Sequence, residues 1–553
     1  MSGTPLKTPA ARRHLATPGQ PAGGGPARVS RVTVVIIAAT VLGLALRLYQ
    51  LSRPGYLFGV TEYDDGPDFG SAVWLVRGYL PYHDFIIVQP PGITLLMSPV
   101  ALATKGLGTD WAMAVARIVT AVAGGASVAL AGLLVRHRGL LATVLTCGIL
   151  AVFPSSIQSA HTVLLEPWLV LFCLAGAVAV FDGDGLTESG RRLVWGGALF
   201  GFAGAIKVWA VFPVVIVLVL AARRPRRAVS YLGGAAAGFI LPVLPFVIAA
   251  PRIFYKSVIV AQLVRIDEVR TPLAFRLHEM TGLTDVPRLG VAALIIISAG
   301  LVAAVAACAI LASRATGRPP SALEWFGYGT SVLAVAAFLW PADFYYHYAG
   351  FLAPFLALAI ALPVSRLVTA GGSQADRGAG DRGAGGRGLA RPAVAAAALA
   401  IIIMGGVQFG VEAAAQQPPL APATPGVPPG DVAAARRVIP PGACVLADQV
   451  SYIIAADRFI SRVPGCSRML DGVGTDYSLS GGRNAATGAA SSPAVRAAWL
   501  AALRPAQYLW MSALAYKRIP LGAPEVAGYI NSHFIPVPGG PFGLFVRRGL
   551  HPR

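Results

Sequence analysis

Residues 60–92, VTEYDDGPDFGSAVWLVRGYLPYHDFIIVQPPG, form the stretch from which we derive the expected fold. They follow the first long apolar run and combine ionisable groups with large aromatic side chains. These residues are Glu62, Tyr63, Asp64, Asp65, Asp68, Trp74, Tyr79, Tyr82, His83 and Asp84. Charged residues make up only 13% of the whole chain, so this density of acids is unusual. We interpret the stretch as a polar loop at a membrane surface.

Long apolar blocks separate the polar stretches. The chain has 553 residues, of which 55% are hydrophobic, and its mean hydropathy is +0.65. A spanning helix needs roughly 20 apolar residues, and only helices and closed barrels satisfy their backbone within lipid. The sequence therefore predicts a polytopic α-helical membrane protein in the plasma (inner) membrane.

The net charge of +20 comes mainly from arginines in short gaps between apolar blocks. This distribution is the positive-inside pattern of membrane proteins. A nucleic-acid-binding protein would carry a basic face on a soluble module, and the sequence contains no such module. The expected partner is the lipid bilayer, and nucleic acid is excluded.

The basic gaps also predict the topology. Residues 1–30 are rich in Pro, Gly, Ala and Arg and should form a disordered cytoplasmic tail, so the first helix, about residues 32–51, runs outward. The acidic loop, residues 52–92, then lies outside. Residues 193–222 have arginines at both ends and should form a hairpin of two short helices with its apex near residues 207–213. Residues 93–103 are too short to cross and should lie at the interface or re-enter.

About eleven crossings result from this reading. Besides the first helix and the hairpin, they are residues 111–135, 140–153, 163–181, 228–248, 291–312, 325–340, 348–367 and 394–409. The Gly/Arg/Asp repeat at residues 372–388 reads as a flexible cytoplasmic linker. Residues 31–411 would thus form a membrane-embedded module.

A second, more polar region follows a Pro-rich linker at residues 412–430. Three runs, residues 443–447, 507–511 and 542–547, read as short buried strands between helical stretches. We therefore expect residues 431–553 to form a small α/β domain, which the odd number of crossings places outside. In that compartment Cys444 and Cys466 could form a disulfide, and no Cys/His metal-ligand spacing is present.

This topology brings four polar features to the outer face: the acidic loop, His161 with Glu166, Lys207, and Asp343 with His347. Ionisable groups at membrane depth are expensive and usually mark a functional pathway. A carboxylate here could act as general base on an acceptor hydroxyl. Lys207 and nearby arginines could hold the phosphate of a leaving group. The acids could also bind a divalent cation through oxygen ligands.

A structural explanation exists for each of these residues. Asp64 and Asp65 could belong to a solvated DDGP turn, and Asp68 and Asp84 could serve as scaffold. Glu166, before Pro167, could favour the N-terminus of a helix. Lys207 could extend its ammonium group to the membrane interface, and His347 could belong to an interfacial aromatic belt.

Three segments resemble a known family. Asp64-Asp65-Gly66, RGYLPYHDF (residues 77–85) and QPPG (residues 89–92) resemble the first outer loop of the GT-C glycosyltransferases. These membrane enzymes use polyprenyl-phosphate sugars and include protein O-mannosyltransferases and aminoarabinose transferases. The family's loop typically has Glu where this chain has Asp65. GFAGAIKVWAVFPV (residues 201–214) is similar to the family's short helix hairpin with a Lys at its turn, and FYYHYAGFLAPFLAL (residues 344–358) to the start of a late helix.

The resemblance covers roughly the first 370 residues and implies roles for particular side chains. Asp64 would be the catalytic base, with Asp65 beside it, and Lys207 would contact the donor phosphate. The remaining expected substrate-site residues are Tyr82, Asp84, His161, Glu166 and His347. A sugar would pass from the polyprenyl-phosphate donor to a cell-envelope glycan, glycolipid or protein by a single displacement with inversion.

Two other functions fit a chain of this class. A transporter or flippase of a lipid-linked sugar would tend to show internal repeats and charges near the bilayer midplane. The sequence has no convincing repeat, and its charges gather in one outer layer. A binding or assembly protein with a glycan-recognising C-terminal domain is the third alternative. The glycosyltransferase is favoured because it accounts for the acidic loop.

Overall fold

The computed structural model describes residues 30–265, 270–284, 289–378, 390–414, 429–513, 515 and 518–550. The predicted disordered tail, apart from Ser30, lies outside these ranges, as do most of the Pro-rich linker and residues 379–388 of the Gly/Arg/Asp repeat. The first residues of that repeat continue a helix, since α17 extends to Gly378.

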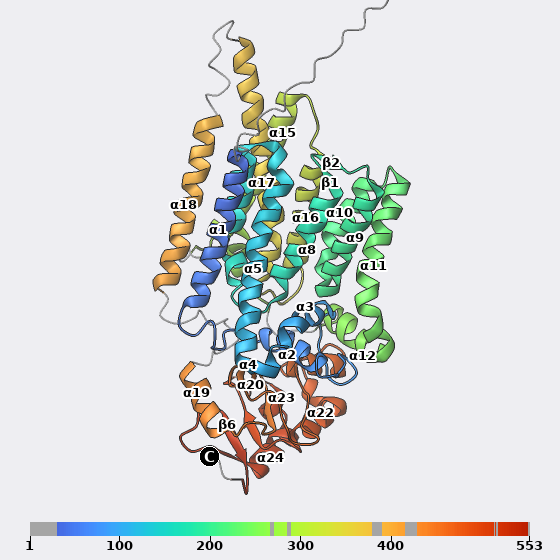
Figure 1. The fold of residues 1–553 in the computed structure, drawn as a ribbon, viewed down its shortest axis with the longest axis vertical. Helices are drawn as coiled ribbons and strands as arrows, with labels where there is room; N and C mark the ends of the chain where they lie inside the picture. Colours follow the sequence, from blue (N-terminus) through green and yellow to red (C-terminus); the bar gives the residue numbers. More distant parts are fainter. Residues whose placement is uncertain are drawn as a thin grey trace, which may run out of the picture.

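Long helices lie side by side in a bundle (Figure 1). Within the described ranges, seven are long and apolar enough to cross a membrane. They are α1 (Arg31–Ser52), α5 (Thr109–Val135), α11 (Pro225–Ala249), α15 (Val291–Thr316), α16 (Ala322–Leu339), α17 (Tyr348–Gly378) and α18 (Ala390–Ala414). Large apolar side chains on α15 and α18, such as Ile296 and Ile402, are exposed. Exposed aliphatic surface on long helices suits contact with lipid tails, so the polytopic membrane class is confirmed.

Shorter apolar helices complete the bundle: α6 (Leu140–Val152), α8 (Leu165–Val180), α9 (Gly190–Ile206) and α10 (Val211–Ala221). Each of the eleven predicted crossing segments therefore contains a helix. The break between α9 and α10 falls at Lys207, followed by a 3₁₀ turn, Val208–Ala210. Helix α9 packs closely on α11, because a Cβ added to Gly201 would lie 2.0 Å from the Ala235 carbonyl oxygen. Small residues permit such close helix contacts in membranes.

The remaining connections of the bundle are short. They comprise a 3₁₀ turn (Arg136–Arg138), α7 (Pro154–Gln158) and a two-stranded antiparallel hairpin, β1 (Phe181–Asp182) with β2 (Gly185–Leu186). The hairpin joins α8 to α9. Arg138 links it to α16, because the guanidinium contacts both Asp184 (2.5 Å) and Glu324 (3.2 Å).

A layer of short helices separates the bundle from the C-terminal domain (Figure 1). It contains α2 (Asp65–Leu75), α3 (Gly92–Ala101), α4 (Thr104–Leu107), α12 (Pro251–Phe254), a π-helical turn (Tyr255–Val260), α13 (Ala261–Leu263) and α14 (Leu273–Thr281). Helix α3 is the short helix predicted after Pro90-Pro91. The acidic stretch thus folds into this layer, at one end of the bundle.

The C-terminal domain is a small mixed sheet covered by helices. The strand order is β3 (Val445–Ala447), β4 (Tyr508–Trp510), β6 (Leu544–Arg547), β5 (Phe534–Pro536), with β3 and β4 parallel and the other pairs antiparallel. The helices are α19 (Pro429–Val438), α20 (Ser451–Ala455), α21 (Gly472–Ser480), a 3₁₀ turn (Ala489–Ser491), α22 (Pro493–Leu503), α23 (Ile519–Gly522) and α24 (Pro524–His533). All three predicted strands are confirmed, whereas β5, a three-residue edge strand ending in Pro, was not predicted.

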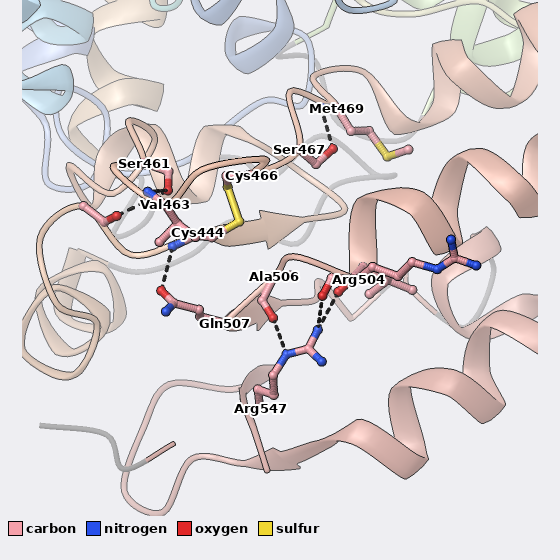
Figure 2. The surroundings of a disulfide bond; sticks show 12 residues. Cys444, Ser461, Val463, Cys466, Ser467, Met469, Arg504, Ala506, Gln507 and Arg547 are labelled. Carbon is pink, nitrogen blue, oxygen red and sulfur yellow. Dashed lines mark hydrogen bonds between the residues drawn. A yellow bond between two sulfur atoms is a disulfide. The ribbon is translucent and has the colours of Figure 1, made fainter. Parts of the chain in front are cut away.

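A disulfide joins Cys444 to Cys466 (Figure 2). Gln507 holds the first of these cysteines against β4, because its side chain accepts a hydrogen bond from the Cys444 N–H (3.1 Å) and its own N–H donates to the Cys444 carbonyl (2.8 Å). The disulfide therefore anchors the segment that leads from β3 to α21. Cys147 and Cys173 are buried free thiols, as expected for small hydrophobic side chains.

Candidate active site

A cavity of about 560 Å³ lies between the bundle and the C-terminal domain. Its walls come from the acidic loop, the start of α8, the turn after α9, the region of α13 and α14, the segment before α17, and two segments of the C-terminal domain. Among its lining residues are Glu62, Tyr63, Asp64, Asp68, Glu166, Lys207, Arg265, Asp343, Tyr346, His347, Asp471 and Arg518. Four of the eight sequence-predicted site residues therefore line the cavity.

Asp64 stands at the start of α2 and is exposed in this cavity. Its carboxylate makes no hydrogen bond or ion pair with the residues that the structure describes. Asp68, one helical turn later, also lines the cavity but is buried, and its Oδ2 lacks a hydrogen-bond partner among the described residues. Loss of surrounding water raises the pKa of Asp64, while His347 and Lys207 oppose that rise. The position suits an acid that reacts with a bound substrate.

Asp65 points away from the cavity and is fully buried. Its Oδ2 lies 2.6 Å from Arg117 Nη2 on α5 and accepts a hydrogen bond from the Thr162 hydroxyl (2.5 Å). Its Oδ1 accepts one from the Ser451 hydroxyl of α20 (2.8 Å). Arg117 also donates to the carbonyls of Tyr56, Leu57 and Gly59, 2.8–2.9 Å away. Asp65 thus joins the acidic loop to the bundle and to the C-terminal domain.

Glu166, Lys207 and His347 form one buried cluster in the cavity wall. Lys207 Nζ lies 2.6 Å and His347 Nδ1 2.9 Å from the same oxygen, Glu166 Oε1. The Lys207 ammonium also lies over the rings of Trp209 (3.8 Å) and Tyr348 (4.6 Å), which are favourable cation–π contacts. These partners fix the cation at the bundle end of the cavity.

A glycine helps to set the position of Lys207. Gly92 begins α3, and a Cβ placed there would lie 2.5 Å from the Ala205 carbonyl oxygen near the end of α9. Such a separation is too short for any side chain, so the two backbones can meet only with glycine at this position. The QPPG motif therefore packs α3 against the turn that carries Lys207.

Tyr82, Asp84 and His161 lie outside the cavity lining. Tyr82 is buried, with a positive φ of 65°, and its hydroxyl donates to the Gln89 carbonyl (2.5 Å). Asp84 accepts a hydrogen bond from the Leu80 N–H (2.7 Å). His161 is buried and lies 3.1 Å from the Thr61 hydroxyl. These side chains hold the backbone of the acidic loop and its neighbours.

The sequence did not identify the cavity residues of the C-terminal domain. Asp471 and Arg518 are the charged ones, and Arg518 Nη1 lies 3.1 Å from Asp448 Oδ2. The only sequence signal for Asp471 is that it precedes a helix, GVGTDYSLS, as an N-cap residue does. Burial raises the pKa of Asp471 to about 6. The domain has no recognisable sequence motif. Its residues reach the cavity only through packing between distant parts of the chain, which the sequence alone does not show.

A metal site is not evident in the described part of the chain. No three His, Cys, Asp or Glu side chains there are grouped so that they could hold a metal ion. The carboxylates of the cavity share it with the basic side chains of Lys207, His347, Arg265 and Arg518.

Comparisons with known proteins agree with this architecture. Residues 88–335 match Glycosyltransferase family 87. ArnT from Cupriavidus metallidurans in the apo state has a TM-score of 0.53 and 14% identity, over 88% of this chain and 94% of ArnT. Its undecaprenyl-phosphate-bound structure has a TM-score of 0.50 and 16% identity, over 77% and 84%. The peptide-tethered oligosaccharyltransferase of Archaeoglobus fulgidus has a TM-score of 0.50 and 14% identity, over 93% and 74%.

Two further comparisons give weaker or no similarity. A chain of the protein O-mannosyltransferase Pmt1–Pmt2 complex of Saccharomyces cerevisiae matches 44% of this chain at 19% identity, with a TM-score of only 0.31. This chain spans about a third of that one, 35%. A search of curated proteins gives no match.

The family match and the fold agree with each other: residues 88–335 match a glycosyltransferase family, and the chain shares the fold of the membrane protein ArnT. The family 87 match covers less than half of the chain, from the end of the acidic stretch to α16. Both comparisons agree with the predicted glycosyltransferase class.

Proposed function

We propose that this enzyme transfers a sugar from a polyprenyl-phosphate donor to a hydroxyl of a cell-envelope glycan, glycolipid or protein outside the cell. The observation that carries the proposal is the carboxylate of Asp64, which pairs with none of the described residues and is exposed in a cavity that Lys207 also lines. A base and a fixed cation within one cavity are what sugar transfer from a phosphate leaving group requires.

The reaction would be a single displacement. Asp64 takes the proton of the acceptor hydroxyl, and the oxygen attacks the anomeric carbon on the face opposite the phosphate. The bond between the anomeric carbon and the phosphate oxygen breaks, polyprenyl phosphate leaves, and the anomeric configuration inverts. Because its pKa is raised, Asp64 is a stronger base than an ordinary aspartate, which favours proton transfer near neutral pH.

The leaving phosphate would lie at the cationic end of the cavity. Lys207 is held there by Glu166 and two aromatic rings, and Arg265 lines the same cavity. Fixed positive groups stabilise charge that develops on a leaving phosphate. ArnT, which shares this fold, was solved with undecaprenyl phosphate bound, and this supports a polyprenyl phosphate as the ligand. We assign Asp65 a positioning role because it holds the loop that presents Asp64.

The proposal includes an orientation in the plasma membrane. The N-terminus would be cytoplasmic, residues 31–411 would cross the bilayer about eleven times, and the domain of residues 431–553 would be extracytoplasmic. The Cys444–Cys466 disulfide supports this orientation, since such bonds persist in oxidising compartments.

Replacing Asp64 by Asn tests the assignment of the base. We expect transfer from polyprenyl-phosphate sugars to fall by about 10²–10⁴-fold, the usual contribution of a general base, while undecaprenyl phosphate still binds. Asp182→Asn is the control, because it makes the same change at an exposed aspartate of the β1–β2 hairpin, outside the cavity lining. Undiminished turnover in Asp64→Asn would rule out Asp64 as the base.

A further inference from the structure

We propose that the C-terminal domain supplies the acceptor subsite of this cavity, in which Asp471 and Arg518 surround the ring of Tyr63 and bind a neutral, hydroxyl-rich sugar. The inference rests on the proposed transferase function and names its acceptor class. It gives the C-terminal domain a direct part in the reaction.

Tyr63 connects the subsite to the proposed base. It immediately precedes Asp64, and its hydroxyl donates a hydrogen bond to Asp471 Oδ1 (3.0 Å) and accepts one from the Val473 N–H (3.2 Å). The Arg518 guanidinium lies over its ring at 4.9 Å. A sugar bound beside this ring therefore places its hydroxyls next to Asp64.

Asp471 offers an open hydrogen-bond acceptor. Asp471 is 5% exposed and lines the cavity. Oδ1 already accepts bonds from Tyr63 and from the Gly474 N–H (2.7 Å), the latter as N-cap of α21. Oδ2 makes no hydrogen bond with the residues that the structure describes. Because Asp471 lines the cavity, a hydroxyl group of a bound ligand can donate a hydrogen bond to this oxygen.

Arg518 offers the complementary donors. Its Nη1 donates to the Asp448 carbonyl (3.2 Å) and to Asp448 Oδ2 (3.1 Å). Its Nε and Nη2 groups donate to none of the described residues, although the side chain is only 14% exposed and lines the cavity. The pairing with Asp448 holds the planar guanidinium in place, so its remaining N–H groups are available to ligand oxygens.

The chemistry of the subsite favours a neutral sugar over an anion. A sugar hydroxyl can donate to Asp471 and accept from Arg518, and its apolar ring face can pack on an aromatic residue. An anionic acceptor would meet the carboxylates of Asp471 and Asp64, which share the cavity. The phosphate of the donor fits the end of the cavity that contains Lys207. The donor and the acceptor would therefore bind at different ends of the cavity.

Direct binding tests this subsite without requiring turnover. Full-length protein in lipid nanodiscs is titrated with methyl glycosides of glucose, mannose and galactose and with glucuronate, observed by saturation-transfer NMR. Undecaprenyl phosphate is titrated separately. Asp471→Asn retains a good N-cap residue, and Arg518→Lys retains a cation for Asp448. We expect each variant to weaken binding of at least one methyl glycoside by about tenfold, as for loss of a hydrogen bond to a charged group, with undecaprenyl phosphate binding unchanged.

Asp476→Asn is the matched control, because Asp476 lies on α21 but accepts from Trp499 Nε1 (3.0 Å) and does not line the cavity. It should bind both ligands like the wild type. The subsite is overturned if Asp471→Asn and Arg518→Lys bind the glycosides normally, if they lose undecaprenyl phosphate instead, or if glucuronate binds more tightly than methyl glucoside. Glycoside binding that depends on Asp471 in an enzyme inactive with every polyprenyl-phosphate sugar supports the subsite but contradicts the proposed donor.

Discussion

Glu62 is a buried acid that links three parts of the molecule. Its Oε2 accepts a hydrogen bond from the Tyr346 hydroxyl (3.1 Å), and its backbone carbonyl accepts bonds from Gln449 Nε2 (3.1 Å) and the Ser451 hydroxyl (3.2 Å). Burial, with a further contribution from Asp64, raises its pKa from 4.5 to about 7. The folded protein therefore favours the protonated form of Glu62.

This pKa shift predicts a pH-dependent stability. Because the folded-state pKa lies above the unfolded one, the contribution is fully present below about pH 4.5 and is lost as pH rises through about 7. The loss amounts to at most about 3 kcal/mol at 1.36 kcal/mol per pKa unit. Glu62→Gln mimics the protonated form, so its Tm should exceed that of the wild type at pH 8 and approach it at pH 5.

Differential scanning fluorimetry of the detergent-solubilised protein between pH 5 and 8 measures this difference. Glu525→Gln is the control, because Glu525 is an exposed glutamate of the C-terminal domain paired with Arg496. Its melting curve should follow that of the wild type across the range. A constant Tm difference between Glu62→Gln and the wild type at all pH values would contradict the assigned pKa.

Asp64 and Asp65 show how far the roles of single residues can be predicted from the sequence. The sequence singled out Asp64 and Asp65 together, because their density in an apolar chain is visible without a structure. Successive residues at a helix start point in different directions, and here one faces the cavity while the other faces Arg117. Separating their roles required partners from α5, the segment before α8, and α20, which no local pattern encodes.

The contact between α2 and α20 joins the proposed catalytic loop to the C-terminal domain. Gly66, in the first turn of α2, packs on the start of α20: an added Cβ would lie 2.5 Å from Ser451 Oγ and 2.6 Å from Ser451 N. Those distances are too short for any side chain, so the two helices can meet only if position 66 is glycine. The geometry of the DDG motif is thus set partly by a domain almost 400 residues away.

Gly66→Ala should therefore damage the enzyme by overpacking. We expect a loss of about 1–3 kcal/mol of stability, measured as a lower Tm, together with reduced transfer activity because Asp64 shifts with α2. Gly106→Ala is the control, since a Cβ there meets no atom within 4 Å. A Gly66→Ala enzyme with wild-type Tm and activity would show that the two elements are not tightly coupled.

Elements differ in how far their sequence reveals them. The spanning helices were predictable because roughly 20 apolar residues have few alternatives, and arginines between them set the hairpin at Lys207. The strands β3, β4 and β6 were predictable as short apolar runs. Helices such as α20, five residues long, depend on tertiary contacts, because isolated helices shorter than about 12 residues are marginal.

At the scale of the whole molecule, the bundle and the C-terminal domain form one cavity. Besides the Ser451 contacts, Arg436 of α19 pairs with Asp110 of α5, and the Thr109 N–H donates to Asp457 (2.7 Å). These polar contacts fix the domain at the end of the bundle where Asp64 and Lys207 lie. The sequence predicted a membrane-embedded module and a separate domain outside the membrane. It could not predict that they share a site, because that depends on pairs of residues more than 300 positions apart.

The orientation of this assembly can be tested by reporter fusions. Alkaline phosphatase folds only in an oxidising compartment, so a fusion after Arg553 should be active if the C-terminal domain and its disulfide lie outside the cytoplasm. A fusion after Arg138, in the basic turn between α5 and α6, should be inactive because the positive-inside rule places that turn in the cytoplasm. A fluorescent protein that matures only in the cytoplasm should give the opposite pattern. An inactive phosphatase at Arg553 with an active one at Arg138 would show that the topology is the reverse of the proposed one. Asp64 would then face substrates presented from the cytoplasm.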